Sequence, residues 1–312
     1  MRVLITGAAG FVGRSMVRHI TEVRPDLQVR ALDLNMADAN NIECISGSIL
    51  DTNDLMNSVQ DCDYVIHLAA MLGVKRTESS PLQCLNVNVQ GTINLLEACV
   101  REQVKKVVLA SSSEVYGEPV MVPIREDSPL NPRSVYGISK ITAEEYLKAY
   151  AQRYNIDWNI VRLFNMYGPG QTSEFVIPRF IASVQRGQSP VVYGDGSQIR
   201  AFCYVADGVS AIASLLDDDI SNHTFNIGNP ESKISMSDLA NKVTSLLGNG
   251  IQPEFVPLSA STRKSGREIW TRIPDISKAN ETLGYTPKIN LEEGLMLVAK
   301  SGEIPDSHFD PL

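Results

Sequence analysis

The sequence predicts an α/β fold with a doubly wound parallel sheet, followed by a smaller C-terminal α/β domain. Short apolar runs alternate with helical patterns from the first residue to about residue 165. Such alternation builds a parallel sheet with right-handed crossovers. The first apolar run is also followed by a glycine-rich turn and a helix, which is how sheets of the Rossmann type begin.

The N-terminal strand, turn and helix predict a dinucleotide site. Residues 1–5 form the apolar run and residues 6–13 the turn. Gly7 permits the tight turn, Gly10 lets the backbone approach a pyrophosphate, and Gly13 allows close packing of helix against strand. The helix N-terminus then offers N–H donors and a positive dipole end to the phosphates.

A second strand at residues 28–32 ends in Asp33, twenty residues after Gly13. A carboxylate at this position accepts hydrogen bonds from a ribose diol and repels a 2′-phosphate. The spacing therefore predicts NAD, rather than NADP, as the cofactor.

The strand–helix alternation continues along the chain. We expect strands at 42–45, 63–70 and 106–110 and helices at 54–59 and about 85–101. Ligands of doubly wound sheets bind at the carboxyl ends of such strands. Beyond residue 165 the elements shorten and glycine and proline punctuate them. We therefore predict a dinucleotide-binding domain at 1–165, which the chain re-enters from its C-terminal half, and a substrate domain at 166–312.

Composition limits the partners and the compartment. The net charge of −8 argues against nonspecific binding of nucleic acid or an anionic membrane, so an anionic substrate has to meet a local cluster of arginines. No apolar run approaches the roughly 20 residues that cross a bilayer. The first run leads directly into the glycine turn, so we expect no secretory signal.

Cysteine and histidine usage adds two expectations. The five cysteines are scattered without a Cys-x-x-Cys spacing, which predicts free thiols in a reducing compartment, the cytoplasm. The four histidines are isolated, so a metal site has little support. His67 closes an apolar strand, and we interpret it as a core histidine.

Tyr136 and Lys140 stand four residues apart at the start of a predicted helix at 137–154. At that spacing both side chains project from one face. An ammonium stabilises a neighbouring phenolate and lowers its pKa, so the pair predicts a tyrosine that takes a proton from an alcohol. Ser112 follows a central strand, where its hydroxyl can bridge Tyr136 and a substrate oxygen.

The chain resembles the extended short-chain dehydrogenase/reductase family, the nucleotide-sugar epimerases and dehydratases. Besides the Tyr136 and Lys140 pair, the similarity lies in residues 6–13 (TGAAGFVG), 67–70 (HLAA), 88–92 (NVQGT), 111–117 (SSSEVYG), 162–169 (RLFNMYGP), 193–202 (YGDGSQIRAF) and 275–279 (DISKA). These segments run in order through nearly the whole chain.

The resemblance implies roles for individual residues. Tyr136 would be the catalytic base, Lys140 would modulate its pKa and bind the nicotinamide ribose, and Ser112 would orient the sugar. The cofactor-binding residues would be Gly7, Gly10, Phe11, Val12, Gly13, Asp33, Leu34, Ser48, Ile49, Leu68, Ala69, Ala70, Ser111, Tyr136 and Lys140. Many relatives have an aspartate at the position of Ser48 that contacts adenine. Here this contact is open, and Ser48 is alternatively a turn serine.

The C-terminal part would bind a nucleotide-diphosphate sugar. The substrate-binding residues would be Ser112, Ser113, Asn165, Val176, Ile177, Arg200, Arg267 and Arg272. Val176 and Ile177 would lie along the base, and the arginines would hold the diphosphate with their guanidinium forks. We interpret Asp207 and Lys278 as structural. The helices near 85–103 and 137–154 resemble those that pair between subunits in this family, so a homodimer is expected.

The reaction is left with alternatives. All members of the group begin with oxidation at C4 of the sugar, and we choose an NAD-dependent C4 epimerase acting through a 4-keto intermediate. Glu114 lies two residues beyond Ser112, where a carboxylate is more typical of 4,6-dehydratases and uronate decarboxylases. Against these, Ser113 replaces the aspartate of the dehydratases, and residues 137–139 lack the Asp-Glu-Gly sequence of the decarboxylases.

Two further alternatives stay open. Glu114 is alternatively a turn carboxylate that bonds nearby N–H groups. A catalytically silent NAD-binding protein is a remote alternative for the chain as a whole, because Ser112, Tyr136 and Lys140 are all present.

Overall fold

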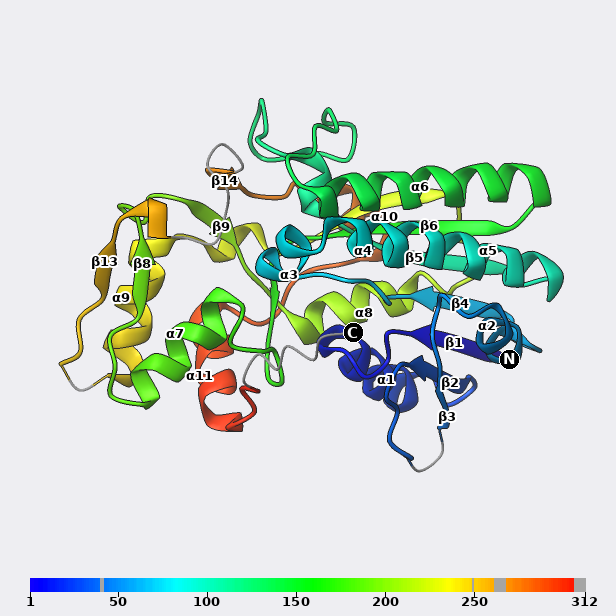
Figure 1. Cartoon of the computed structure of the whole chain (residues 1–312), viewed down its shortest axis with the longest axis horizontal. Helices are drawn as coiled ribbons and strands as arrows, with labels where there is room; N and C mark the ends of the chain where they lie inside the picture. The colour runs from blue at the N-terminus through cyan, green and yellow to red at the C-terminus, as the bar shows by residue number, and fades with distance from the viewer. Residues whose placement is uncertain (40–41, 249, 261–267, 306–312) are drawn as a thin grey trace.

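The computed structural model describes residues 1–39, 42–248, 250–260 and 268–305. Its centre is a seven-stranded sheet with the strand order β11-β6-β5-β4-β1-β2-β3 (Figure 1). The strands are β1 (Arg2–Thr6), β2 (Gln28–Asp33), β3 (Glu43–Ser46), β4 (Tyr64–His67), β5 (Lys106–Ser112), β6 (Asp157–Leu163) and β11 (His223–Ile227). All neighbouring pairs are parallel. The predicted doubly wound α/β sheet is confirmed, and β11 is the strand contributed by the C-terminal half.

Both faces of the sheet are covered because successive strand residues point to opposite sides. Val3 and Ile5 of β1 enter a cluster with α1 (Phe11–Val23) and α8 (Val205–Ser214). Leu4, between them, enters a second cluster with α2 (Thr52–Val59), α5 (Gly91–Arg101) and α6 (Val135–Tyr154). Burial on both faces is why these strands are nearly continuous apolar runs.

The predicted helix at 85–101 is longer and less regular than expected. It starts with α4 (Pro81–Leu85), continues through a π-helical turn at Asn86–Gln90, and ends with α5. Asn88 lies in the π-helical turn, and its amide bonds both the N–H and the carbonyl of Met71. This turn therefore ties the helix to the loop after β4, which contains the short helix α3 (Val74–Ser79).

The C-terminal elements pack on one side of the sheet's carboxyl edge (Figure 1). Helices α7 (Val176–Gln185), α9 (Met236–Leu247) and α11 (Leu291–Ser301) share an apolar cluster. The short strands pair as β8 (Val191–Tyr193) with β13 (Glu254–Val256), β7 (Met166–Tyr167) with β10 (Cys203–Tyr204), and β9 (Ile199–Ala201) with β12 (Lys233–Ser235) and β14 (Thr271–Arg272). Helix α10 (Ser277–Leu283) returns to pack against β11 and α8. The domain boundary at residue 165 stays a prediction.

Two features are absent from the described residues, a membrane-spanning helix and a metal-binding cluster. Within the described ranges no helix combines the length and apolar character needed to cross a bilayer. Nor do three or more His, Cys, Asp or Glu side chains in this part of the chain gather into a group suited to a metal ion. The five cysteines are free thiols.

Candidate functional site

One cavity of about 640 Å³ lies where the carboxyl ends of the central strands meet the C-terminal elements. It is lined by Gly7, Gly10 and Gly13, by residues 110–114, by Tyr136 and Lys140, and by side chains of α7, β9 and β14. Ligand sites of small molecules commonly have this size. The cavity brings together residues predicted for the cofactor and residues predicted for the substrate.

The glycine turn is shaped for close approach. Gly7 has a φ of +73°, and a Cβ there would lie 2.6 Å from the Ala69 nitrogen. A Cβ on Gly13 would lie 2.0 Å from the Gly7 carbonyl oxygen. Gly10 caps α1 without a side-chain hydrogen bond, so the first N–H groups of the helix remain directed at the cavity. The turn therefore fits a pyrophosphate.

Asp33 lies beside this turn at the end of β2. Its carboxylate accepts hydrogen bonds from the backbone N–H of Ala9 (2.9 Å) and of Leu34 (2.7 Å). These bonds fix the carboxylate next to the glycine turn, where the adenosine ribose of a dinucleotide would lie. These features fit NAD, whose nicotinamide would supply the hydride acceptor.

Only some of the remaining predicted cofactor residues line the cavity. Phe11, Val12, Leu68 and Ala70 line the cavity. Ile49 is buried, and its side chain fills the space that a Cβ on Gly91 would need. The Ser48 hydroxyl accepts a hydrogen bond from the Leu50 N–H (3.1 Å), as a turn serine does.

Ser111 uses its hydroxyl for the core of the protein. It donates to Glu144 of α6, whose carboxylate also pairs with Arg162 of β6 at 2.7 Å. Both charged side chains are almost completely buried. This network connects β5, α6 and β6 directly behind Ser112, so Ser111 contributes mainly to the framework of the site.

Tyr136 and Lys140 project from the first two turns of α6. The Ser134 hydroxyl caps this helix by accepting a hydrogen bond from the Gly137 N–H (3.0 Å). The Lys140 Nζ lies 5.8 Å from the centre of the Tyr136 ring and donates to the Ala110 carbonyl (2.8 Å). Ser112, at the end of β5, is within hydrogen-bonding reach of Tyr136. Ser112, Tyr136 and Lys140 therefore line the same part of the cavity, and Glu114, the fourth side chain predicted as catalytic, lines it too.

The expected lowering of the Tyr136 pKa by Lys140 is wrong for this structure. Burial, followed by the nearby Glu114 carboxylate, raises the pKa of Tyr136, while the hydrogen bond with Ser112 acts in the opposite direction. Burial also lowers the pKa of Lys140 to about 8. Burial is the largest cause of both pKa shifts, and the Lys140 ammonium donates to the Ala110 carbonyl rather than to the phenol.

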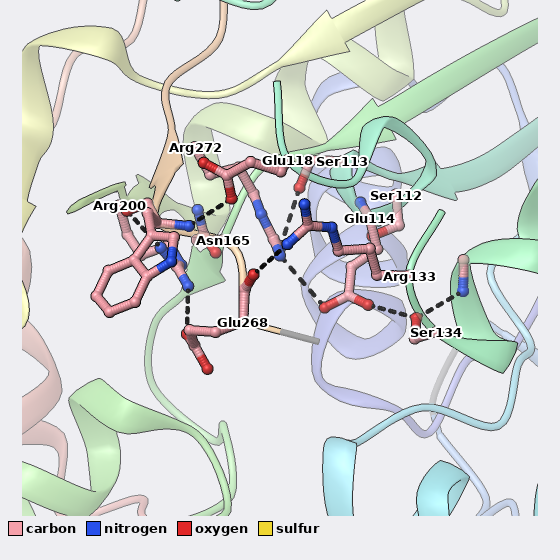
Figure 2. Close-up of polar contacts among 12 residues, drawn as sticks. Ser112, Ser113, Glu114, Glu118, Arg133, Ser134, Asn165, Arg200, Glu268 and Arg272 are labelled. Atoms are coloured by element: carbon pink, nitrogen blue, oxygen red, sulfur yellow. Dashed lines mark hydrogen bonds and ion pairs between the residues drawn. The ribbon is translucent and has the colours of Figure 1, made fainter. Parts of the chain in front are cut away.

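Glu114, two residues after Ser112, is the centre of a polar cluster (Figure 2). Its carboxylate accepts a hydrogen bond from the Ser134 hydroxyl (2.8 Å) and pairs with Arg272 (3.4 Å). Arg272 also reaches the Ser113 hydroxyl (3.5 Å). Glu114 is thus bound by side chains from α6 and β14 rather than only by turn N–H groups.

Arg200 forms the second charged cluster, on β9. Its guanidinium pairs with Glu268 (3.3 Å) and donates to the carbonyls of Ile199 and Trp270. Residues 268–270 are also tied to the loop after β5, since Arg133 donates to the Glu268 carbonyl and Glu118 accepts from the Trp270 N–H. Figure 2 shows that these contacts connect the two clusters.

The other predicted substrate residues lie along the same wall. Asn165 has a positive φ of 35° and donates to the Ala201 carbonyl (3.0 Å). Val176 and Ile177 start α7 and line the cavity. Arg267 lies outside the described residues.

Several cavity residues were missed by the sequence analysis. They are Glu174, Arg179, Tyr193 and Glu268. Arg179 was detectable in principle, because it follows Val176 by three residues and so shares its helix face. Glu174 and Glu268 carry no motif that distinguishes them from surface glutamates.

Three side chains predicted as structural are confirmed as such. His67 lies between the hydroxyls of Thr6 (2.7 Å) and Thr92 (3.1 Å). Asp207 accepts from the Ile289 N–H, and Lys278 donates to the Thr224 carbonyl.

Comparison with known proteins adds the following. The model of the NAD dependent epimerase/dehydratase family matches residues 3–228. A UDP-N-acetyl-α-D-glucosaminuronate decarboxylase of Bacillus cytotoxicus is 34% identical over 315 residues, covering 94% of this chain and 95% of the relative. A UDP-glucose 4-epimerase of Mycolicibacterium smegmatis is 33% identical, covering 95% and 96%. The crystal structure of a UDP-glucose 4-epimerase of Thermotoga maritima with UDP-glucose has a TM-score of 0.88 and 31% identity, covering 96% and 98%.

Proposed function

The chain belongs to the NAD dependent epimerase/dehydratase family, and from this premise we propose that it inverts C4 of a UDP-hexose, such as UDP-glucose or UDP-galactose. The observation that carries the proposal is the meeting of Ser112, Tyr136 and Lys140 in a cavity that also holds the glycine turn and Arg200. A secondary alcohol placed there would touch a proton acceptor next to the nicotinamide position.

In the proposed reaction, Ser112, Tyr136 and Lys140 have separate roles. The Ser112 hydroxyl holds the C4 oxygen, and Tyr136 takes its proton as the C4 hydrogen leaves as hydride. Bound NAD, held by the glycine turn and Asp33, would supply the acceptor for this hydride and the donor for its return. The 4-keto sugar turns between the two transfers, so the opposite face of C4 receives the hydride. For Tyr136 to act as the base, the protonated Lys140, 5.8 Å from the centre of its ring, has to offset the burial that raises the pKa of the phenol.

Glu114 supports epimerisation over 4,6-dehydration. A dehydratase needs a base for the C5 proton and an acid for the departing C6 oxygen. Ser113 provides neither, and the Glu114 carboxylate is occupied by Ser134 and Arg272. A C4 epimerase needs no further acid or base beyond Tyr136.

Decarboxylation of a uronate is the second candidate, and Arg272 is the observation that favours it. Its guanidinium lies close enough to Tyr136 to affect the phenol electrostatically, so a C6 carboxylate that displaced Glu114 from Arg272 would be held beside the reacting alcohol. The Bacillus cytotoxicus relative is named as a decarboxylase of such a sugar. The intermediate would again be a 4-keto sugar, from which carbon dioxide is lost.

A product analysis in deuterated solvent separates these reactions. The purified protein is incubated with NAD and, separately, UDP-glucose, UDP-galactose and UDP-glucuronate, and the products are identified by NMR. We expect interconversion of the two hexoses without deuterium incorporation. Deuterium at C5 with loss of the C6 hydroxyl would replace the proposal by dehydration, and a pentose product from the uronate would replace it by decarboxylation.

We also propose a homodimer. Helix α6 carries a stripe of side chains at helical spacing, Ile138, Thr142, Tyr146 and Ala149, of which Ile138 is 47% and Tyr146 39% exposed. Helices α5 and α6 lie side by side at one edge of the molecule (Figure 1). Two such pairs would form a four-helix interface. The free cysteines support the cytoplasm as the compartment.

A further inference from the structure

Arg179 is a cavity residue whose guanidinium has no ion-pair partner among the residues that the structure describes. It lies in the first turn of α7, and its Nε is buried without a hydrogen-bond partner. In the part of the chain that the structure describes, no carboxylate forms an ion pair with it. Its guanidinium instead faces the rings of Phe180 and Tyr193, each with its centre 5.8 Å away.

The other two arginines of the cavity wall differ in this respect. Arg200 pairs with Glu268, and Arg272 pairs with Glu114. An anion that approaches either of them also approaches a carboxylate. Among the three arginines of the described cavity wall, Arg179 is therefore the one that can attract an anion without a glutamate paired to it.

A partly buried guanidinium with no ion-pair partner among the described residues, and with its Nε buried and unbonded, is costly to the folded protein. Burial lowers the pKa of Arg179, and Tyr193 offsets this only in part. Such a cost is typical of binding sites, where a residue is retained for its ligand rather than for stability. The ligand that compensates it must bring a negative charge into the cavity.

We propose that Arg179 binds the diphosphate of the nucleotide-sugar substrate. The inference rests on the proposed function and deepens it, because it assigns a substrate contact to a residue outside the predicted set. A planar guanidinium matches phosphate oxygens with paired hydrogen bonds. The N-terminus of α7 lies in the same wall at Val176 and Ile177, and its dipole adds to the attraction.

The test compares UDP with uridine, which lacks the diphosphate. Dissociation constants of both are measured by calorimetry on the NAD-loaded protein and on Arg179→Met. We expect the UDP constant to rise about 10- to 100-fold, as for the loss of a charge-assisted contact, and the uridine constant to change less than about 3-fold. Arg179→Lys should give an intermediate value. Arg186→Met, which removes an exposed arginine at the end of the same helix, is the matched control.

Several outcomes would overturn the inference. An equal weakening of UDP and uridine would assign Arg179 to the base. An unchanged UDP constant with weakened UDP-glucuronate would assign it to a sugar carboxylate. If the wild-type protein binds UDP no more tightly than uridine, the diphosphate contributes nothing to binding and has no subsite in the cavity.

Two further measurements distinguish diphosphate binding by Arg179 from a structural role of this residue and from a failure of the proposed reaction. Without UDP, Arg179→Met should melt at the same temperature as the wild type or higher, because an unpaired buried charge is removed. A lower melting temperature would indicate a structural role and contradict the proposal. UDP binding that depends on Arg179 without any turnover of UDP-hexoses would refute the proposed reaction and leave the inference intact.

Discussion

Tyr136 shows what a residue's surroundings add to its motif. The spacing from Lys140 predicted the pair correctly, but the pKa of the phenol depends on burial and on Glu114, which lies 22 residues away in sequence. A motif records which side chains share a helix face. It does not record the desolvation that the rest of the fold imposes on them.

Replacing Tyr136 by phenylalanine tests its role as the base. We expect kcat for hexose interconversion to fall by roughly 10²- to 10⁴-fold, the usual contribution of a general base. NAD affinity and thermal stability should stay close to the wild type. Tyr154→Phe, at the exposed last residue of the same helix, is the control. A loss of less than about tenfold would remove Tyr136 from the proton transfer.

His67 gives the fold an acid-sensitive point. Burial lowers its pKa to about 3, whereas an unfolded histidine titrates near 6.5. Because the folded-state pKa is depressed, the unfolded state binds more protons between these values, and stability falls as the pH drops through this window.

We therefore expect the wild type to lose roughly 2–3 kcal/mol more than His67→Gln between pH 7 and pH 4.5, at about 1.4 kcal/mol per pH unit below 6.5. Urea unfolding at the two pH values measures the difference, because other titrating groups cancel between the two proteins. Equal losses would show that His67 titrates normally in the folded state.

At the scale of elements, two glycines of the turn have different roles: we expect Gly13 to matter for stability and Gly10 for NAD binding. A Cβ on Gly13 would lie 2.0 Å from the Gly7 oxygen and 2.7 Å from the Ala8 Cα, whereas a Cβ on Gly10 meets only the Gly7 oxygen, at 3.1 Å. Gly13→Ala should therefore lower the free energy of unfolding by roughly 2–4 kcal/mol. Gly10→Ala should change it by less than about 1 kcal/mol but weaken NAD binding, because the methyl group faces the pyrophosphate position.

Chemical denaturation without NAD and a titration with NAD distinguish the two variants. If both destabilise the fold equally, the close packing of α1 against Gly7 and Ala8 of the turn is not what Gly13 provides. If Gly10→Ala binds NAD as the wild type does, the pyrophosphate does not approach the backbone at this position.

Elements defined by local pattern were predictable, and those defined by distant contacts were not. The strands, α1 and α6 follow from apolar runs, glycines and helical spacing in consecutive residues. The π-helical turn at Asn86–Gln90 coincides with the bonds from Asn88 to Met71, 17 residues away. Those bonds cannot be inferred from the pattern of residues 85–101 alone, so the sequence indicated one regular helix.

At the scale of the whole molecule, the cavity is assembled from contacts that span the chain. Arg200 and Glu268 are 68 residues apart, and Arg272 and Glu114 are 158 apart. The candidate arginines were chosen because of the resemblance to the family, and their binding of substrate stays a prediction. Their pairing with glutamates was not predictable, and this pairing is what distinguishes Arg179 from the other arginines.

The proposed dimer depends on one surface, the exposed face of α6. Burying the exposed Ile138 and Tyr146 of two copies against each other would remove apolar area from water, and a stable interface needs about 800 Å² from each partner. We expect the double variant Ile138→Glu with Tyr146→Glu to sediment as a monomer at concentrations where the wild type is a dimer, because four carboxylates would face one another across the two-fold axis. Val23→Glu, an equally apolar and exposed position on α1, is the control and should leave the dimer intact. A double variant that keeps the wild-type mass would place the interface elsewhere, and a wild type that sediments as a monomer would rule out the dimer while leaving the cavity and its chemistry as described.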